Sequence, residues 1–193
     1  MLENLHPYHI ILASNSPRRK ELLQRLGLEF KVRNLLGINE SYPSSLRGED
    51  IARYIARQKA EAYRHTMQPD ELIITADTIV CSDGEVLGKP ADTEEAKSML
   101  RKLSGQTHQV ITGVSLLSEK KTLDFAVTSY VKFAKLDKSE IDYYVDQYLP
   151  LDKAGAYGIQ EWIGMVAVEE LRGSFFNVMG LPVQRLYRVL KDF

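Results

Sequence analysis

The sequence predicts an α/β protein, because apolar runs typical of strands alternate with amphipathic patterns typical of helices. Three stretches carry this prediction. Residues 10–13 form an apolar run that passes through a short polar loop into a helical pattern. Residues 71–82 form the strongest strand, a nearly continuous apolar run that suits burial on both faces of a sheet. Residues 106–135 have the pattern of a long antiparallel hairpin, with a turn at Lys120-Lys121.

Length and composition indicate a globular protein with one domain spanning residues 1–193. The net charge of −1 gives no bulk attraction to nucleic acid or to an anionic membrane, so any phosphate binding must be local. The single cysteine, Cys81, excludes an intramolecular disulfide and is compatible with a reducing compartment. The N-terminal residues have no signal-peptide pattern and no run resembles a membrane span, so we expect a cytoplasmic protein.

The loop between the first strand and the first helix has the features of an anion site. Ser16 can cap the helix, Pro17 suits its first position, and Gly27 follows its last apolar residue. A helix N-terminus presents backbone N–H groups to an anion, and Arg18 and Arg19 add donors that suit phosphate oxygens. A capped surface helix with a solvated basic first turn explains the same residues, so both interpretations stay open.

Two carboxylates stand out from the predicted elements. Asp77 and Thr78 interrupt the strand over 71–82, and a buried carboxylate is costly unless it is paired or hydrogen-bonded. Asp77 is therefore a candidate functional acid, and the alternative is a structural aspartate held by its neighbours. Glu40 is the notable acid of a long predicted loop over 34–48, where a solvated carboxylate is the alternative.

Two lysines accompany these acids. Lys59 lies at the edge of the apolar face of a predicted helix over 50–65, so its ammonium either reaches a cleft beside the sheet or extends to solvent. Asp83-Gly84 predicts a hairpin turn, and Gly88-Lys89-Pro90 ends the returning strand. The lysine of that tripeptide is therefore presented at the end of a tight hairpin whose other arm holds Asp77.

The remaining chain supplies further elements. Capping-box patterns predict helices that begin after Asp92 and after Asp137. The isolated His108 is expected to be structural or exposed. The segment 151–160, with glycines and alanines around Tyr157, either brings backbone close to a ligand or forms a structural turn. Two further strands and a final helix are predicted over residues 162–168, 174–178 and from 180 onward.

The polar residues that interrupt the apolar elements carry charges of both signs. The cations are Arg18, Arg19, Lys59 and Lys89, and the anions are Asp77 and Glu40. Such a set suits a polyphosphate, because basic groups hold phosphates while a carboxylate recruits Mg²⁺ or Mn²⁺ or orients a water molecule. The residues alone therefore predict phosphoanhydride hydrolysis or transfer.

Several motifs follow one another along the chain. They are Ala-Ser-Asn-Ser-Pro-Arg-Arg at 13–19, Ala-Asp-Thr-Ile-Val at 76–80, Gly-Lys-Pro at 88–90, Leu-Ser-Gly-Gln-Thr-His at 103–108, Asp-Lys-Ala-Gly-Ala-Tyr-Gly-Ile-Gln at 152–160 and Val-Met-Gly-Leu-Pro at 178–182. From about residue 9 to the C-terminus this order resembles the Maf family of nucleoside triphosphate pyrophosphatases. The form of the motif at 152–160 resembles the branch that acts on dTTP and UTP, rather than the branch that prefers 7-methyl-GTP.

The resemblance implies a mixed, elongated, twisted sheet flanked by helices, shared with the inosine triphosphate pyrophosphatases, and two lobes with a central cleft for the substrate. It implies hydrolysis between the α and β phosphates with a divalent metal cation, Mg²⁺ or Mn²⁺, and a homodimer. The expected partner is a nucleoside triphosphate, with neither nucleic acid nor membrane. Two alternatives stay open: a pyrophosphatase for another non-standard nucleotide, and a nucleotide-binding cell-division regulator that does not need turnover.

The resemblance also implies roles for individual residues. Asp77 matches the proton acceptor of the family and is the first of the candidate catalytic residues Asp77, Lys59 and Lys89. The candidate phosphate-binding residues are Ser14 and Arg19, and those tied to base selectivity are Arg18, Thr78 and Gln160. The candidate metal ligands are Asp77 and Glu40, the latter in a less regular loop. Glu161-Trp162 replaces the usual glycine-rich continuation, a departure at the rim of the implied base pocket.

Overall fold

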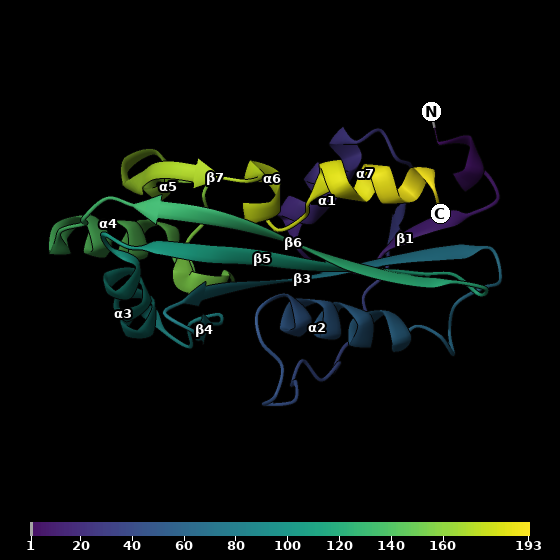
Figure 1. Ribbon diagram of the computed structural model, residues 1–193, viewed down its shortest axis with the longest axis horizontal. Helices are drawn as coiled ribbons and strands as arrows, with labels where there is room; N and C mark the ends of the chain where they lie inside the picture. Colours follow the sequence, from purple (N-terminus) through teal and green to yellow (C-terminus); the bar gives the residue numbers. More distant parts are fainter. Residues whose placement is uncertain (1) are drawn as a thin grey trace. The chain divides into compact units, whose positions relative to one another are not determined.

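The computed structural model describes residues 2–193 and contains both strands and helices (Figure 1). The strands are β1 (His9–Leu12), β2 (Lys31–Val32), β3 (Glu71–Ser82), β4 (Glu85–Leu87), β5 (Thr107–Leu117), β6 (Thr122–Phe133) and β7 (Val168–Arg172). The α-helices are α1 (Pro17–Arg25), α2 (Glu49–Glu61), α3 (Thr93–Leu103), α4 (Lys138–Tyr148), α5 (Trp162–Ala167), α6 (Phe175–Val178) and α7 (Val183–Lys191). Short 3-10 helices are η1 (Glu3–Leu5) and η2 (Ala154–Ala156). The predicted α/β class is confirmed.

The strands of the described chain form a mixed sheet. They hydrogen-bond in the order β2-β1-β3-β5-β6-β7, and β4 pairs with β3. Strand β1 runs parallel to both β2 and β3, whereas β4 is antiparallel to β3 and β7 is antiparallel to β6. The predicted strand over 71–82 has the bounds of β3, and β5 and β6 are neighbours as the predicted hairpin requires. Asp83 and Gly84, both with positive φ, form the predicted turn between β3 and β4.

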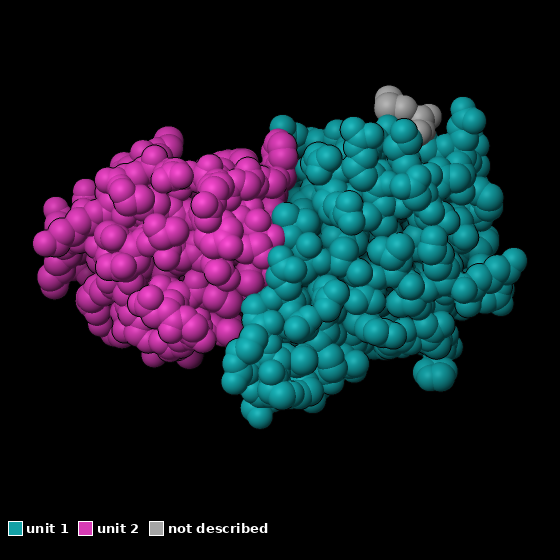
Figure 2. Space-filling model, in the orientation of Figure 1, with its two compact units in different colours: residues 1–77, 112–127, 180–193 teal, residues 78–111, 128–179 magenta. Residues whose placement is uncertain are grey.

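The chain divides into two compact units (Figure 2). Unit 1 comprises the described residues up to Asp77 together with 112–127 and 180–193, and unit 2 comprises 78–111 and 128–179. Strands β3, β5 and β6 each contribute residues to both units. The single-domain organisation, the elongation of the sheet and the central cleft stay predictions. Among residues 2–193, no helix is both long enough and apolar enough to cross a bilayer.

Helix α2 packs very closely on the strands of unit 1, because its buried face combines three alanines with two isoleucines. Ala52, Ala56 and Ala60 recur every four residues and are fully buried. Thr75 Oγ1 on β3 donates a hydrogen bond to the carbonyl oxygen of Ala56 at 2.6 Å. A Cβ atom on Gly113 of β5 would lie 2.2 Å from the carbonyl oxygen of Ala52, so this approach requires glycine. The packing holds α2 firmly against the strand that carries the acid of the candidate site.

The predicted helix caps are present in the structure. The Ser16 hydroxyl accepts a hydrogen bond from the Arg19 backbone N–H at 3.4 Å, and Gly27 takes a positive φ just after α1. In α4, Asp137 and Glu140 form a complete capping box in which each side chain accepts the other residue's backbone N–H. These local signals mark where the helices begin and end, while packing of the apolar faces stabilises them.

The strand predicted over 162–168 is wrong, because most of that segment is helix α5. Ile163 and Ala167 lie four residues apart and are fully buried, as one face of a helix requires. A Cβ atom on Gly164 would lie 1.8 Å from the carbonyl oxygen of Ile159. The glycine therefore allows the helix to pack against the backbone of Ile159. The apolar composition of the run does not reveal this contact.

The strand predicted over 174–178 is also wrong, because Phe175–Val178 forms the short helix α6. The Ser174 hydroxyl caps this helix by accepting from the Asn177 backbone N–H at 3.3 Å. The fully buried Asn177 side chain donates to the carbonyl oxygen of Val110 at 3.1 Å and to the Ser129 hydroxyl at 3.0 Å. The strand of this region is β7, which ends just before the expected turn at Gly173, where φ is 122°.

Candidate functional site

An ion pair between α2 and β3 joins two of the predicted residues of unit 1. Lys59 Nζ lies 2.7 Å from Asp77 Oδ1, and the two side chains are 14% and 13% exposed. The same ammonium lies 3.1 Å from Glu40 Oε1, and the Glu40 side chain is 50% exposed. The Lys59 ammonium therefore lies beside the sheet rather than extending to solvent. The loop over 34–48 contains no helix or strand, as predicted, and places its acid at this ammonium.

Arg19 is anchored by atoms of the loop before α1 and of the segment before α7. Its Nε donates to the carbonyl oxygen of Gly180 at 2.8 Å, and its Nη1 donates to Ser14 Oγ at 3.4 Å. Ser14 is buried, and its hydroxyl also accepts the backbone N–H of Ser16 at 3.2 Å. The contact with Gly180 is invisible to local sequence patterns, because the two residues are 161 positions apart.

The charges of unit 1 act on one another. Burial lowers the pKa of the Arg19 guanidinium, while the nearby carboxylates of Asp77 and Glu40 raise it and the neighbouring charge of Arg18 lowers it. Arginine remains protonated in spite of such shifts. The opposing effects show that both arginines and both acids belong to one electrostatic environment. Together with the ammonium of Lys59, unit 1 therefore gathers cations around two carboxylates.

The oxygen donors of unit 1 fit a divalent metal cation that shares its ligands with phosphate. Asp77 and Glu40 converge on one cationic group, the Lys59 ammonium. No cluster of three or more histidine, cysteine, aspartate or glutamate residues suited to a metal exists in the described chain. Magnesium is commonly held by one or two carboxylates together with substrate phosphates, rather than by a complete protein cage. Two carboxylates are consistent with that mode of binding.

The other predicted residues belong to unit 2. Thr78 is half-buried on β3, and Lys89 is exposed just after β4. Gln160 is exposed at the end of the segment over 151–160. The backbone N–H of Gly155 donates to the carbonyl oxygen of Gly88 at 3.0 Å, so this segment lies against the tripeptide that contains Lys89. Within this unit, the sequence motifs at 88–90 and 152–160 are therefore neighbours.

Sequence reasoning missed the polar network beneath Gln160. The Glu161 carboxylate pairs with Lys153 Nζ at 3.2 Å and accepts a hydrogen bond from the Tyr144 hydroxyl. Lys153 is buried, and Tyr144 is fully buried. The only signal in the sequence is the glutamate itself, at the position where the chain departs from the family pattern. In the local sequence, Lys153 cannot be distinguished from an ordinary surface lysine. Tyr144 cannot be distinguished from an ordinary core tyrosine.

His108 is buried in an aromatic cluster of unit 2. Its Nε2 lies 2.7 Å from the Tyr157 hydroxyl, and its ring packs edge-on against Tyr157 and Phe133. Burial lowers the pKa of His108 to about 4 and raises the pKa of the Tyr157 phenol. Both side chains are therefore neutral at pH 7, and this environment fits a structural histidine rather than a metal ligand.

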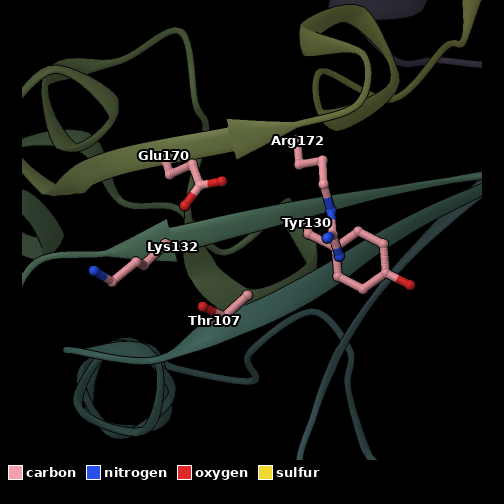
Figure 3. Close-up of a pocket in the computed structure, with 5 residues that line it drawn as sticks. All are labelled: Thr107, Tyr130, Lys132, Glu170 and Arg172. Atoms are coloured by element: carbon pink, nitrogen blue, oxygen red, sulfur yellow. The ribbon is translucent and has the colours of Figure 1, made fainter.

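A hollow lined by residues of unit 2 does not add to the candidate site (Figure 3). It has a volume of about 190 Å³ and is lined by Thr107, Tyr130, Lys132, Glu170 and Arg172. Its cations already have partners. Lys132 Nζ lies 2.8 Å from Glu169 Oε2, and the Arg172 guanidinium lies 4.3 Å from the centre of the Tyr130 ring (Figure 3). No residue of the predicted site lines this hollow.

Comparison with known proteins decides the family. The model of the Maf-like proteins matches residues 9–193. The chain belongs to the Maf family. A Maf relative from Phocaeicola vulgatus, named dTTP/UTP pyrophosphatase, is 61% identical over 191 residues and covers 99% of both chains. A second relative of that name, from Parabacteroides distasonis, is 59% identical over 193 residues and covers 100% of both chains.

The Maf chain also resembles a more distant solved structure. A HAM1 protein from Coxiella burnetii gives a TM-score of 0.50 at 16% identity, covering 96% of this chain and 100% of that chain. At this identity the likeness supports the fold alone. It agrees with the mixed sheet flanked by helices that the strand pairing establishes.

Proposed function

We propose that this Maf protein is a nucleoside triphosphate pyrophosphatase that hydrolyses dTTP and UTP to the nucleoside monophosphate and pyrophosphate. The observation that carries the proposal is the largely buried pair of Lys59 and Asp77, with Glu40 on the same ammonium, together with the partly buried guanidinium of Arg19. The name shared by relatives that match nearly the whole chain at 61% and 59% identity supports the choice of substrate.

The chemistry of the proposed reaction needs a positioned base and neutralisation of phosphate charge. The Asp77 carboxylate, held on a buried strand, orients a water molecule and accepts its proton. Arg19 and Ser14 hold phosphate oxygens, and the Lys59 ammonium keeps the carboxylate in place and limits repulsion of the anionic substrate. Lys89 neutralises charge that builds on the departing pyrophosphate, a role that follows from its match to the family motif.

We propose that Asp77 and Glu40 hold a divalent cation, Mg²⁺ or Mn²⁺, together with the phosphates of the substrate. When bound, such a cation supplies charge neutralisation at the phosphoanhydride. The Lys59 ammonium is also a counter-charge of both carboxylates. The donor set of two carboxylates is consistent with binding only when nucleotide is present.

Selectivity for the base is proposed to depend on Arg18, Thr78 and Gln160. The Gln160 side chain carries an amide donor and an amide acceptor, which match the alternating imide edge of uracil or thymine. A base without that edge leaves the amide unpaired, and this costs more than a lost contact. We also propose a cytoplasmic location, where nucleoside triphosphates are abundant, and a homodimer as the assembly.

The test is a pyrophosphate-release assay on dTTP, UTP, CTP, ATP, GTP and modified pyrimidine triphosphates, with Mg²⁺ and with Mn²⁺. The proposal predicts the highest kcat/KM for dTTP and UTP. It predicts that Asp77→Asn lowers kcat about 10²–10⁴-fold, because a general base contributes on that order, while nucleotide binding remains measurable. Glu169→Gln, at an exposed pair on β7, is the matched control and keeps wild-type turnover. Binding of dTTP without pyrophosphate release, with either metal, would contradict the proposal and favour a nucleotide-binding regulator.

A further inference from the structure

Gln160 lies in a hydrogen-bonded turn whose ends are Gly158 and Glu161. The backbone N–H of Glu161 donates to the carbonyl oxygen of Gly158 at 3.0 Å, and Gln160 is exposed between them. A Cβ atom on Gly158 would lie 2.9 Å from Gln160 Nε2 and 2.9 Å from Glu161 Cδ. The amide and the carboxylate therefore both fold back over this glycine. Whatever fixes the turn also fixes the direction of the Gln160 amide.

A single hydroxyl group contacts both ends of this turn. Tyr144 on α4 is fully buried, and its oxygen accepts the backbone N–H of Gly158 at 3.0 Å and contacts Glu161 Oε2. Burial, with the adjacent carboxylate, raises the pKa of the Tyr144 phenol, so the group keeps its proton. Since a carboxylate can only accept, the phenol donates that proton to Glu161. The direction of every hydrogen bond in the network is thereby determined.

The second carboxylate oxygen is also occupied. Lys153 Nζ lies 3.2 Å from Glu161 Oε1 and 2.7 Å from Asp152 Oδ1. The Lys153 side chain is 9% exposed, whereas the Asp152 side chain is 58% exposed. A nearly buried ammonium requires counter-charge, and the less exposed Glu161 supplies it within the protein. Both oxygens of Glu161 therefore contact side chains that are buried in unit 2.

We infer that Glu161 and Tyr144 are positioning residues that hold the turn at Gly158 and thereby set the selectivity of Gln160 for the base. This inference rests on the proposed function, because it assumes that Gln160 recognises the base of the substrate. All residues of the network lie in unit 2, whereas the predicted phosphate-binding residues lie in unit 1. Its loss is therefore expected to act on discrimination between bases more strongly than on the hydrolytic step.

The test compares kcat/KM for UTP with kcat/KM for GTP in the wild type, Tyr144→Phe, Glu161→Ala and the double variant. Each single substitution is expected to lower the ratio of UTP over GTP about tenfold, and the double variant to lower it no further, because both remove one network. Glu161→Gln keeps the size and an acceptor oxygen for Tyr144 but removes the counter-charge of Lys153, so its ratio is expected to lie between those of the wild type and Glu161→Ala. Glu169→Gln on β7 is the control and keeps the wild-type ratio.

The outcomes separate the inference from the proposed function. If Tyr144→Phe and Glu161→Ala reduce turnover of both nucleotides equally, their role is only structural and the inference is overturned. The inference is also overturned if Gln160→Ala lowers the ratio of kcat/KM for UTP over GTP while Tyr144→Phe and Glu161→Ala leave this ratio unchanged. If the wild-type enzyme releases no pyrophosphate from UTP, the proposed function fails and this inference fails with it.

Discussion

Removal of the Lys59 ammonium provides a quantitative test of the charged centre in unit 1. Lys59→Met keeps the aliphatic stem but leaves the Asp77 carboxylate without the cation that lies 2.7 Å away. Breaking a buried pair by removing one partner costs about 3–5 kcal/mol, and exposed pairs are worth about 0–1 kcal/mol. Because these side chains are 14% and 13% exposed, we expect a loss of about 3 kcal/mol in the free energy of unfolding.

Double-mutant cycles divide this loss between the two carboxylates. The coupling energy between Lys59→Met and Asp77→Asn is expected to be about 2 kcal/mol. The coupling between Lys59→Met and Glu40→Gln is expected to stay below about 1 kcal/mol, because Glu40 is 50% exposed and its oxygen lies 3.1 Å away. Lys102→Met is the control, since its partner Glu85 is 60% exposed and water screens the pair.

The assay is urea denaturation at 25 °C without nucleotide or metal, with the m-value required to stay constant across the series. Equal couplings to the two carboxylates would refute the reasoning, because solvent exposure would then not determine the strength of each pair. A Lys59→Met variant as stable as the Lys102→Met control would refute it as well. In that case the Lys59 ammonium would contribute nothing to the free energy of unfolding.

Other predictions concern stability and its pH dependence. Because burial lowers the pKa of His108 to about 4, the unfolded chain binds a proton more readily, and wild-type stability should fall by up to about 3 kcal/mol as the pH drops from about 6.5 to 4. A His108→Phe variant should lack this contribution to the pH profile, and an unchanged profile would contradict the assignment. Gly113→Ala should cost about 3 kcal/mol by urea denaturation, since its Cβ would overlap the carbonyl of Ala52, whereas Gly88→Ala meets no atom within 4 Å and should be nearly neutral. Asp137→Ala should lower the thermal midpoint by an amount equivalent to about 1 kcal/mol, and a loss below about 0.3 kcal/mol would show that the capping box is dispensable.

The elements that the sequence predicts correctly have strong local causes. Strand β3 is recognisable because its apolar run is long, and α1 and α4 are recognisable because Ser16 and Asp137 cap them. The errors at α5 and α6 have a tertiary cause. Gly164 contacts the backbone of Ile159, and Asn177 bonds to distant strands, so the local apolar pattern does not determine their conformation.

The residues of the candidate site likewise include some that the sequence predicts and some that depend on tertiary packing. Asp77 is predictable because an acid within a buried strand needs an explanation, and the structure supplies the Lys59 ammonium as its partner. The contact of Arg19 with Gly180 and the network of Glu161 with Tyr144 are not predictable, because each depends on how distant segments pack. The catalytic and selectivity roles of these residues stay predictions for experiment.

The most direct test of the central claim is the identity and stoichiometry of the products formed from dTTP. With Mg²⁺ or Mn²⁺ present, ³¹P NMR of the completed reaction should show equal amounts of dTMP and pyrophosphate, and the rate should collapse in Asp77→Asn. Formation of dTDP and orthophosphate, or unchanged product formation by Asp77→Asn, would contradict the claim that this protein cleaves between the α and β phosphates through that aspartate.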